Sequence, residues 1–444
     1  MSILDPDGPI VRLSDAPLPP GVSARLSSRF AALHARSATR GSPHEPAAWF
    51  VPGRIEVVGK HTDYGGGRSL VCAVDRGLAV VARPRDDDRL VIEDVERGSM
   101  AELRASDAEP PLRWSVYPLT VLRRLARNFA EPLRGADIVF ASDLPSAAGM
   151  SSSSALMIAA LLAIARVNRL AERPRWRGSI ANDLDLASYA ATIENGSGFR
   201  ELPGERGVGT EGGSQDHTAI LCCDAGQLTE FSYRPTRRER AITFDDRLVF
   251  VVGVSGVRAQ KTGSARENYN RAARAAAAIL EIWRSQTGRD DETLAAAIAA
   301  APDAAGLIRR ALADRADLVD RFDHFVEETV TIVPSAADRL AAGDLDGFGA
   351  VVDRSQRLAE QLLRNQVPET IALARLARQH GAIAASAFGA GFGGSVWAMV
   401  EARDAARFTE KWQNAYRDTH PGAARLASFF ATRPGPPAFA VSRS

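Results

Sequence analysis

The 444-residue chain has few cysteines, almost no net charge and no long hydrophobic run. Its three cysteines, Cys72 and the adjacent Cys222 and Cys223, are too few for a disulfide framework and lack the spacing of zinc ligands. Because 55 basic residues balance 54 acidic ones, the composition does not support a nucleic-acid or membrane-surface partner. No apolar segment is long enough to span a bilayer, and the start of the chain lacks a signal-peptide pattern. We therefore expect a cytoplasmic protein that binds neither nucleic acid nor membranes.

Hydrophobic residues make up 45% of the chain, enough for a large core, and the length predicts at least two domains. Residues 1–22 are rich in Pro, Asp and Ser and are expected to form an extended arm. A continuous apolar strand at residues 248–254 would open a second lobe. The predicted domains are the arm, an N-terminal lobe at residues 23–240 and a C-terminal lobe at residues 241–444.

Hydrophobic patterning also predicts the individual elements. Helices are expected at residues 23–37, 113–129 and 184–194. Strands are expected at residues 69–83, 90–95, 136–141 and 396–400, and the first two of these should pair as a hairpin. From residue 264 to residue 379 the pattern is mostly helical, with breaks expected at Gly288, Pro302, Pro334, Gly343 and Pro368.

A serine-rich loop lies within residues 142–159, between an apolar strand and an apolar stretch that predicts a buried helix. Gly149 frees the backbone at the turn, and Ser151 to Ser154 fall on the first turn of the helix. The first N–H groups of a helix have no internal partner and carry the positive end of its dipole, so this loop can hold a phosphate. Serines are also common helix caps, and the stretch alone leaves both interpretations open.

Three further segments are candidates for a site. Lys60 to Tyr64 lie between a short strand and three glycines, which indicates either a polar site at a strand end or an Asx-type turn with a solvated histidine. Asp216 follows Gly212 and Gly213 and is either a general base held by the backbone or a helix N-cap. The glycine-rich loop at residues 389–394 brings backbone close to a ligand or to the first lobe.

Three of these clusters, in this order, resemble the three motifs of the galacto-, homoserine, mevalonate and phosphomevalonate (GHMP) kinase superfamily, and most closely those of galactokinases. The first motif corresponds to Pro52-Gly53-Arg54 and Gly59-Lys60-His61-Thr62-Asp63-Tyr64. The second corresponds to Pro145 to Ala155, with Met150 at the family's leucine, and the third to Gly389 to Gly394. Weaker matches lie at residues 213–217 and 255–271, and the whole resemblance spans about Phe50 to Val400.

The resemblance implies an α+β, two-lobed GHMP kinase fold, with a mixed β-sheet and helices in the N-terminal lobe, an α/β C-terminal lobe, and the active site in the cleft between them. It implies a kinase that uses ATP and Mg²⁺ and takes a sugar as its other small-molecule partner. By position, Asp216 would be the catalytic carboxylate, and Arg54 beside it would keep it ionised. The phosphate-binding residues would be Pro145, Gly149, Met150, Ser151, Ser152, Ser153 and Ser154, and the Mg²⁺ ligands Ser153 and Glu194. The sugar-binding residues would be Lys60, His61, Asp63, Tyr64, Gly213, Tyr269 and Gly391.

Lys60 departs from the family pattern, because galactokinases carry a glutamate there that binds a sugar hydroxyl. A lysine reverses both the charge and the direction of the hydrogen bond. It could turn away and pair with an acid such as Glu56, or it could face the sugar and favour a substrate with an acidic group. Glu56, Gln215 and His217 also differ from the family's usual residues, and His217 would either tune Asp216 or fill space.

The predicted function is an ATP-dependent kinase for the anomeric (C1) hydroxyl of a monosaccharide, galactose or a related sugar. The alternatives are a 1-kinase for a uronic acid, amino sugar, pentose or heptose, a non-catalytic sugar and ATP sensor, and a kinase for a non-sugar alcohol such as mevalonate. The sequence does not distinguish a monomer from a homodimer. All of these hypotheses depend on one spatial prediction: that Asp216 and the serine-lined helix start face each other across a shared crevice.

Overall fold

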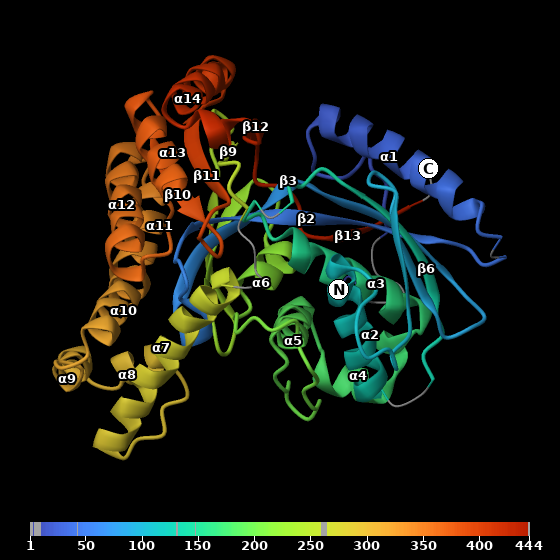
Figure 1. Ribbon diagram of the computed structural model, residues 1–444, viewed down its shortest axis with the longest axis horizontal. Helices are drawn as coiled ribbons and strands as arrows, with labels where there is room; N and C mark the ends of the chain where they lie inside the picture. The colour runs from blue at the N-terminus through green and yellow to red at the C-terminus, as the bar shows by residue number, and fades with distance from the viewer. Residues whose placement is uncertain are drawn as a thin grey trace.

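The computed structural model describes residue 3 and residues 10–41, 43–129, 132–146, 148–258 and 264–442. Residues 1–2 and 4–9 of the predicted arm, and the end of the predicted loop after Val254, lie outside this part of the chain. The described residues form two β-sheets with helices packed on them (Figure 1). The large sheet belongs mainly to the first half of the chain and the small sheet to the second half.

The large sheet has nine strands within the described residues. Their order is β1-β13-β2-β3-β6-β4-β5, with β7 pairing with β3 and β8 with β7. The sheet is mixed, because β1 and β13 pair in parallel, as do β4 and β6. The strands are β1 (Ile10–Val11), β2 (Ala47–Val58), β3 (Arg68–Pro84), β4 (Leu90–Asp94), β5 (Ser99–Leu103), β6 (Ala136–Ser142), β7 (Gln227–Ser232), β8 (Arg237–Thr243) and β13 (Phe439–Val441).

The predicted hairpin between residues 69–83 and 90–95 is wrong. β4 pairs in parallel with β6, where Ile92 lies opposite Ile138, and antiparallel with β5. The edge of β3 is instead taken by β6, with Val80 opposite Phe140. The continuous apolar sequence of β6 is buried on both faces, which requires a central position in the sheet.

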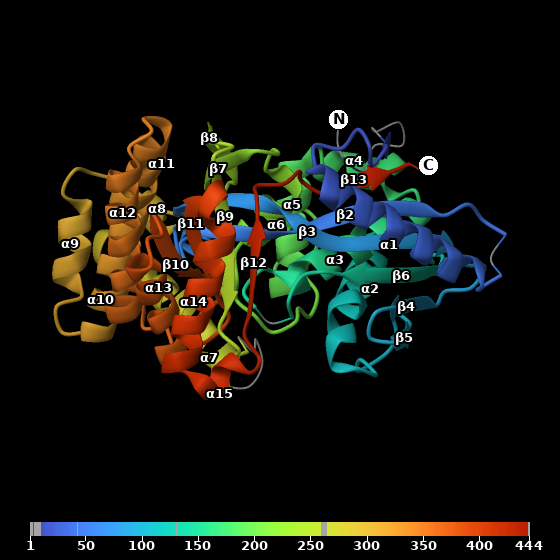
Figure 2. The ribbon, with the colours of Figure 1, turned by 90° about the horizontal axis from the view of Figure 1, so that it is seen from above.

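Helices cover both faces of the large sheet, as the two views show together (Figure 1 and Figure 2). Successive strand residues point to opposite faces, so Phe50, Val81 and Val139 pack on α1, whereas Val51, Val80 and Phe140 belong to the main core with α2 and α3. The predicted helices 23–37, 113–129 and 184–194 are confirmed within a few residues. The helices of this half are α1 (Pro20–Ala38), α2 (Val116–Phe129), α3 (Ser152–Val167), α4 (Pro174–Ser179), α5 (Asp183–Asn195) and α6 (Gln215–Cys222).

The small sheet is antiparallel, in the order β10-β11-β9-β12. Its central strand is the predicted strand at residues 248–254, so that prediction is confirmed. The strands are β9 (Leu248–Val254), β10 (Ala384–Phe388), β11 (Ser395–Glu401) and β12 (Ser428–Thr432). The helices of this half are α7 (Ser264–Thr287), α8 (Leu294–Ala299), α9 (Ala304–Ala311), α10 (Ala316–Val326), α11 (Val333–Ala341), α12 (Leu345–Leu358), α13 (Pro368–Gln379), α14 (Ala405–Thr419) and α15 (Pro421–Ala424).

The predicted break at Pro334 is also wrong, because the backbone stays helical there. A π-helical segment, Glu327–Ile332, joins α10 to α11, and Pro334 lies in the first turn of α11. Proline lacks the N–H that a helix interior needs, but the first turn of a helix leaves that group unused. A second π-helical segment, Ala359–Leu363, follows α12.

The two halves are joined at their sheets and cores. The Trp397 indole N–H of β11 donates a 3.1 Å hydrogen bond to the Glu56 carbonyl of β2. The last strand, β13, returns to the large sheet, where Phe439 lies opposite Phe50. The arm contributes β1 to the same edge, so this part of the arm pairs with the large sheet and does not lie loosely over the surface. Among the described residues we find no helix with the length and hydrophobicity of a membrane span; the domain boundary near residue 241 stays a prediction.

Candidate active site

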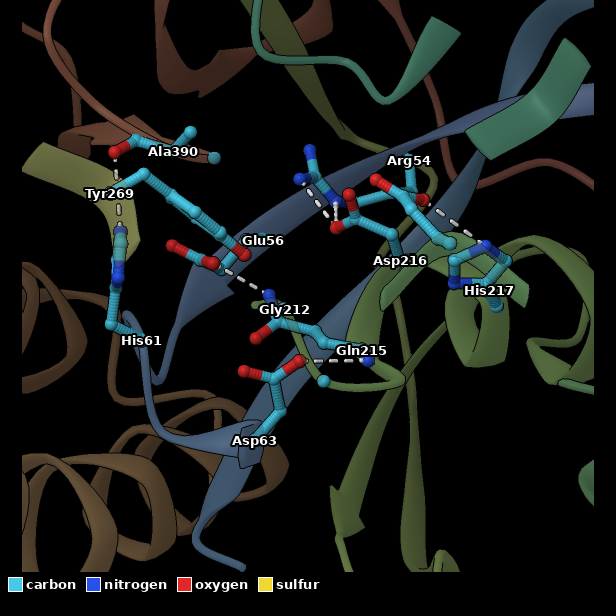
Figure 3. Close-up of a pocket in the computed structure, with 13 residues that line it drawn as sticks. Arg54, Glu56, His61, Asp63, Gly212, Gln215, Asp216, His217, Tyr269 and Ala390 are labelled. Carbon is cyan, nitrogen blue, oxygen red and sulfur yellow. Dashed lines mark hydrogen bonds and ion pairs between the residues drawn. The ribbon is translucent and has the colours of Figure 1, made fainter. Parts of the chain in front are cut away.

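The predicted motif segments meet where β2, the start of α3, the start of α6 and the β10–β11 loop converge. Arg54 on β2 lies at the centre of this region (Figure 3). Its guanidinium donates to the Asp216 Oδ1 atom from Nε at 2.8 Å, and it also donates to the Gly149 carbonyl. The predicted meeting of Asp216 with the serine loop is therefore confirmed.

The Arg54–Asp216 pair combines a buried cation with a partly exposed carboxylate. The Arg54 side chain is 3% exposed and the Asp216 side chain 20%. Burial lowers the pKa of Arg54, but Asp216 and Glu56 outweigh it and the pKa is raised. Asp216 lies in the first turn of α6, where the helix dipole favours a negative charge. One carboxylate thus remains accessible from the cleft while its partner is fixed.

Glycines allow the three loops to touch through their backbones. Gly149 adopts φ +77°, and a Cβ there would lie 2.8 Å from the Phe388 carbonyl oxygen. A Cβ on Gly389 would in turn lie 2.8 Å from the Gly149 carbonyl oxygen. Only glycine fits this close approach. The glycine loop therefore contacts the first lobe, which was one of the two predicted roles.

Two cavities meet at Arg54 and Asp216, which line both of them together with Ala390. We call the first the polar cavity, because most of its side chains are charged or hydrogen-bonding. Its charged side chains are Arg54, Glu56, Asp63, Glu194 and Asp216. Figure 3 shows Arg54, Glu56, Asp63 and Asp216 around one space, with His61, His217 and Tyr269 at its sides.

Gln215 fixes two buried acids of the polar cavity. Its backbone N–H donates to Asp63 Oδ2 at 3.1 Å, and its side-chain Nε2 donates to Glu56 Oε2 at 2.6 Å. Burial raises the pKa of Asp63 to about 6, and burial raises the pKa of Glu56 to about 7 against the opposing effect of Arg54 and Lys60. Gly213 makes room for this arrangement, because a Cβ there would lie 2.5 Å from Asp63 Oδ2.

The His61–Tyr64 segment is held by helices of the second half of the chain. Arg321 of α10 donates to the His61 carbonyl and, at 3.1 Å, to the Tyr64 hydroxyl. The His61 ring lies 5.2 Å from the Tyr269 ring of α7 and bonds the Ala390 carbonyl at 3.2 Å. His61 and Tyr269 line the polar cavity, whereas Tyr64 lies behind them.

Lys60 points away from both cavities. Its ammonium donates to the Ser355 hydroxyl of α12 at 2.7 Å, and that hydroxyl donates to Glu328. Glu328 also accepts the Gly59 backbone N–H at 2.8 Å. Lys60 is 1% exposed, and Ser355 and Glu328 are completely buried. Of the two predicted orientations, the structure has the one that turns away, and the ammonium reaches an acid, Glu328, only through the Ser355 hydroxyl.

We call the second space the apolar cavity; its volume is about 410 Å³. One end is formed by Gly149, Ser151, Ser152 and Ser153 at the start of α3. Ser151 adopts φ +58° and precedes the first helical residue. The other lining side chains include the charged Asp94, Arg97, Arg113 and Arg258, but aromatic and aliphatic ones predominate: Trp114, Tyr117, Phe140, Leu144, Leu156 and Val208. Sequence patterning did not single out these wall residues, since they lie on ordinary strands, helices and loops and belong to no motif.

Glu194 lines the polar cavity and bonds the serine loop. It accepts a 3.0 Å hydrogen bond from the Ser154 hydroxyl and lies 3.3 Å from the His217 Nε2 atom. Ser153 lines the apolar cavity, while Ser154 bonds Glu194. His217 thus contacts Glu194, which lines the polar cavity together with Asp216. Of the predicted site residues that the structure describes, those outside the lining of both cavities are Lys60, Tyr64, Pro145, Met150, Ser154 and Gly391.

Comparisons with known proteins agree with this architecture. The model of the galactokinase galactose-binding signature matches residues 37–84, and those of the GHMP kinase N-terminal and C-terminal domains match residues 117–202 and 336–418. A Streptomyces coelicolor galactokinase is 28% identical over 377 residues, which cover 83% of this chain and 88% of that protein. A Roseiflexus galactokinase is 27% identical over 400 residues, covering 86% and 90%.

A solved structure shares the fold. The crystal structure of Lactococcus lactis galactokinase complexed with galactose matches with a TM-score of 0.75 at 22% identity, covering 92% of this chain and 98% of that one. With these matches, the chain belongs to the GHMP kinase superfamily, and the predicted two-lobed α+β fold is confirmed. Within the superfamily it is a galactokinase-like sugar kinase. Membership of this kinase family implies the use of ATP.

Proposed function

We propose that this sugar kinase transfers the γ-phosphoryl group of ATP to the anomeric (C1) hydroxyl of galactose or a closely related monosaccharide. The observation that carries the proposal is the sharing of Arg54 and Asp216 by both cavities. A sugar in the polar cavity and a nucleotide in the apolar cavity would meet at this pair. The galactose-binding signature over residues 37–84 and the galactokinases among its relatives support galactose.

In the proposed reaction Asp216 accepts the proton of the attacking hydroxyl. The anomeric oxygen forms a bond to the γ-phosphorus, the bond between that phosphorus and the leaving oxygen of ADP breaks, and the proton passes to the Asp216 carboxylate. Phosphoryl transfer needs mainly alignment and neutralisation of charge from the protein. Arg54 holds Asp216 through Oδ1 and supplies a positive charge where the two substrates meet.

The start of α3 is the proposed phosphate site. Gly149 and Ser151 to Ser153 line the cavity at the end of the helix where backbone N–H groups are unpaired. The aromatic and aliphatic walls would enclose the nucleobase. Trp114 is supported from behind by Phe140, with ring centroids 6.0 Å apart, so its ring is held in place for stacking.

The residues present fit a magnesium ion bound with the nucleotide. Mg²⁺ is usually held by one or two carboxylates together with substrate phosphates and water. Glu194 in the polar cavity, and Ser153 in the apolar cavity next to the Ser154 that bonds Glu194, offer such oxygen donors. When bound, Mg²⁺ would neutralise charge on the phosphate oxygens. Glu194 would be kept in position by Ser154 and His217.

The test is phosphorylation of a sugar panel by the purified protein with ATP and Mg²⁺, comparing galactose, galacturonate, N-acetylgalactosamine and arabinose. We expect galactose to have the highest kcat/KM and the product to lose its reducing end, because a phosphate on C1 blocks ring opening. A product with an intact reducing end would overturn phosphorylation at C1. Tight binding of sugar and ATP without any ADP release would identify a sensor.

A further inference from the structure

Glu56 is a buried acid of the polar cavity that the proposed phosphoryl transfer does not use. It lies on β2 two residues after Arg54 and is 3% exposed. Its Oε2 atom accepts the Gln215 bond that Figure 3 shows as a dashed line. Its Oε1 atom is buried and has no hydrogen-bond donor in the part of the chain that the structure describes. Buried acceptors are nearly always paired, so an unpaired one that lines a cavity indicates that a ligand supplies the donor.

The cations nearest to Glu56 are engaged by other partners. The Arg54 guanidinium bonds Asp216 and the Gly149 carbonyl, and the Lys60 ammonium bonds Ser355. Gln215 contacts Glu56 through Oε2 only. The ligand of Oε1 must therefore bring its own O–H or N–H donor.

The charge of the polar cavity restricts the chemistry of that ligand. Its lining contains four carboxylates, Glu56, Asp63, Glu194 and Asp216, and one guanidinium, Arg54. Above pH 7, where Glu56 is ionised, a carboxylate placed against it would leave two acceptors facing each other without a proton between them, and the excess of acids adds repulsion. A neutral hydroxyl meets neither penalty.

We propose that Glu56 Oε1 accepts a hydrogen bond from a sugar hydroxyl other than the anomeric one, and that Glu56 thereby selects neutral sugars over uronic acids. This inference rests on the proposed function of the polar cavity as the sugar site. Glu56 on β2 would then provide the hydrogen-bond acceptor that Lys60, which can only donate, cannot provide. The favoured substrate class is thus a neutral monosaccharide, and the uronic acid among the alternatives is excluded by the same carboxylate.

The experiment measures equilibrium binding, so it does not depend on turnover. Calorimetric titrations at pH 8, where Glu56 is ionised, with Mg²⁺ and a non-hydrolysable ATP analogue would compare galactose, its 2-, 3-, 4- and 6-deoxy derivatives, and galacturonate. In the wild-type protein we expect galacturonate to bind at least 10-fold more weakly than galactose. The deoxy sugar that lacks the hydroxyl bound by Glu56 should bind about 10- to 100-fold more weakly, as for the loss of a hydrogen bond to a charged group.

The matched variants are Glu56→Gln and, as a control with the same charge change outside both cavities, Glu102→Gln on β5. Glu56→Gln should weaken galactose binding about 10-fold. In this variant one deoxy sugar should bind within about threefold of the affinity for galactose, and the difference in affinity between galactose and galacturonate should be smaller than in the wild type. Glu102→Gln should change none of these ratios.

Three results would overturn the inference: equal weakening of all sugars by Glu56→Gln, galacturonate binding to the wild type as tightly as galactose, or no deoxy position that costs the wild type more than about threefold. The last two need no variant, so they hold even if Glu56→Gln fails to fold. A protein that binds galactose through Glu56 but transfers no phosphate would sink the proposed function and leave this inference intact.

Discussion

The two cavities that meet at Arg54 are built from opposite kinds of side chain. The polar cavity has four buried or half-buried acids positioned by specific hydrogen bonds, such as those from Gln215. The apolar cavity has rings and aliphatic side chains at one end and a helix start at the other. The first arrangement fixes acceptor atoms at defined points, which suits a ligand rich in hydroxyl groups. The second offers surfaces and backbone donors, which suit a flat ring and a chain of phosphates.

The comparison also explains which substrate should be discriminated more sharply. A misplaced or missing hydroxyl leaves a buried acceptor such as Glu56 Oε1 unpaired, whereas a change on an apolar wall costs only contact area. We therefore expect substitutions in the polar cavity to affect the choice of sugar and the rate, and those in the apolar cavity to affect nucleotide affinity. The predictions below test that division.

The largest effect is expected from Asp216→Asn, because Asp216 is, among the residues that the structure describes, the only acid that lines both cavities. The amide cannot accept the hydroxyl proton, so kcat should fall by about 10²- to 10⁴-fold, the usual contribution of a general base. ATP binding, measured by calorimetry, should stay within a few-fold of wild type because the apolar walls are unchanged.

Asp224→Asn is the matched control for this substitution. Asp224 follows α6, is 51% exposed and pairs with Arg238 outside both cavities. The control should keep normal turnover. If Asp216→Asn retained turnover near that of the control, Asp216 would not be the base and the two cavities would not meet at the reacting atoms.

Lys60→Met should affect the stability of the fold more than the chemistry. It removes the buried ammonium from Ser355 and leaves the fully buried Glu328 without that cation nearby. Loss of one partner from a buried charged cluster typically costs about 3–5 kcal/mol of unfolding free energy. Chemical denaturation would measure the loss, with Lys411→Met on the exposed surface of α14 as the control.

A direct sugar contact by Lys60 predicts a different outcome. In that case Lys60→Met would change the preference among sugars while leaving the unfolding free energy within about 1 kcal/mol of wild type. That result would contradict the orientation described above and move Lys60 into the polar cavity.

The motif residues of the site could be predicted from the sequence because their types are tied to backbone geometry. Gly149 and Gly389 are required by a backbone approach, and the apolar sequence of β6 and β9 predicts their central positions. The meeting of Asp216 with the serine loop followed from the family resemblance. These features are local in sequence or belong to a known pattern.

The features that the sequence did not predict arise from long-range pairing. The Ser355 hydroxyl that Lys60 bonds lies 295 residues away, and Glu328 is reached only through it, so nothing local links these residues. β4 was expected beside β3 because they are neighbours in sequence, but β6 occupies that edge. Trp114 belongs to no motif, and its place in the cavity wall depends on how α2 packs on the sheet. Tertiary packing determines all three features.

Trp114→Ala should affect nucleotide binding alone and so separate the role of the apolar cavity from that of the polar cavity. Removing the indole takes away a half-buried ring that would stack on the base, so KM for ATP should rise about 10- to 100-fold, as expected for about 2 kcal/mol of lost contact. KM for the sugar should change less than twofold in steady-state assays. Tyr117→Phe, which keeps a ring in the same wall, is the control and should behave like wild type.

A rise in sugar KM equal to the rise in ATP KM would contradict the division between the cavities. It would mean that Trp114 acts through the overall packing of the large sheet. Thermal unfolding of the variant would separate a lost contact with the nucleotide from a packing defect. A lost contact leaves the unfolding midpoint of the free protein unchanged.

The smallest effect is a pH dependence of stability that belongs to the polar cavity. Burial raises the pKa of Glu56 to about 7, so the folded protein holds this proton more tightly than the unfolded chain does. The stabilisation is complete below the ordinary glutamate pKa and is lost as the pH rises toward 7. Arg54 and Lys60 favour the charged form and Asp216 disfavours it, but burial outweighs them.

The wild type should therefore lose on the order of 2 kcal/mol of unfolding free energy relative to Glu56→Gln between pH 5 and pH 8. Unfolding of both proteins across that range measures the difference, and parallel pH profiles would show that Glu56 is charged throughout and that the polar cavity is better solvated than its burial indicates.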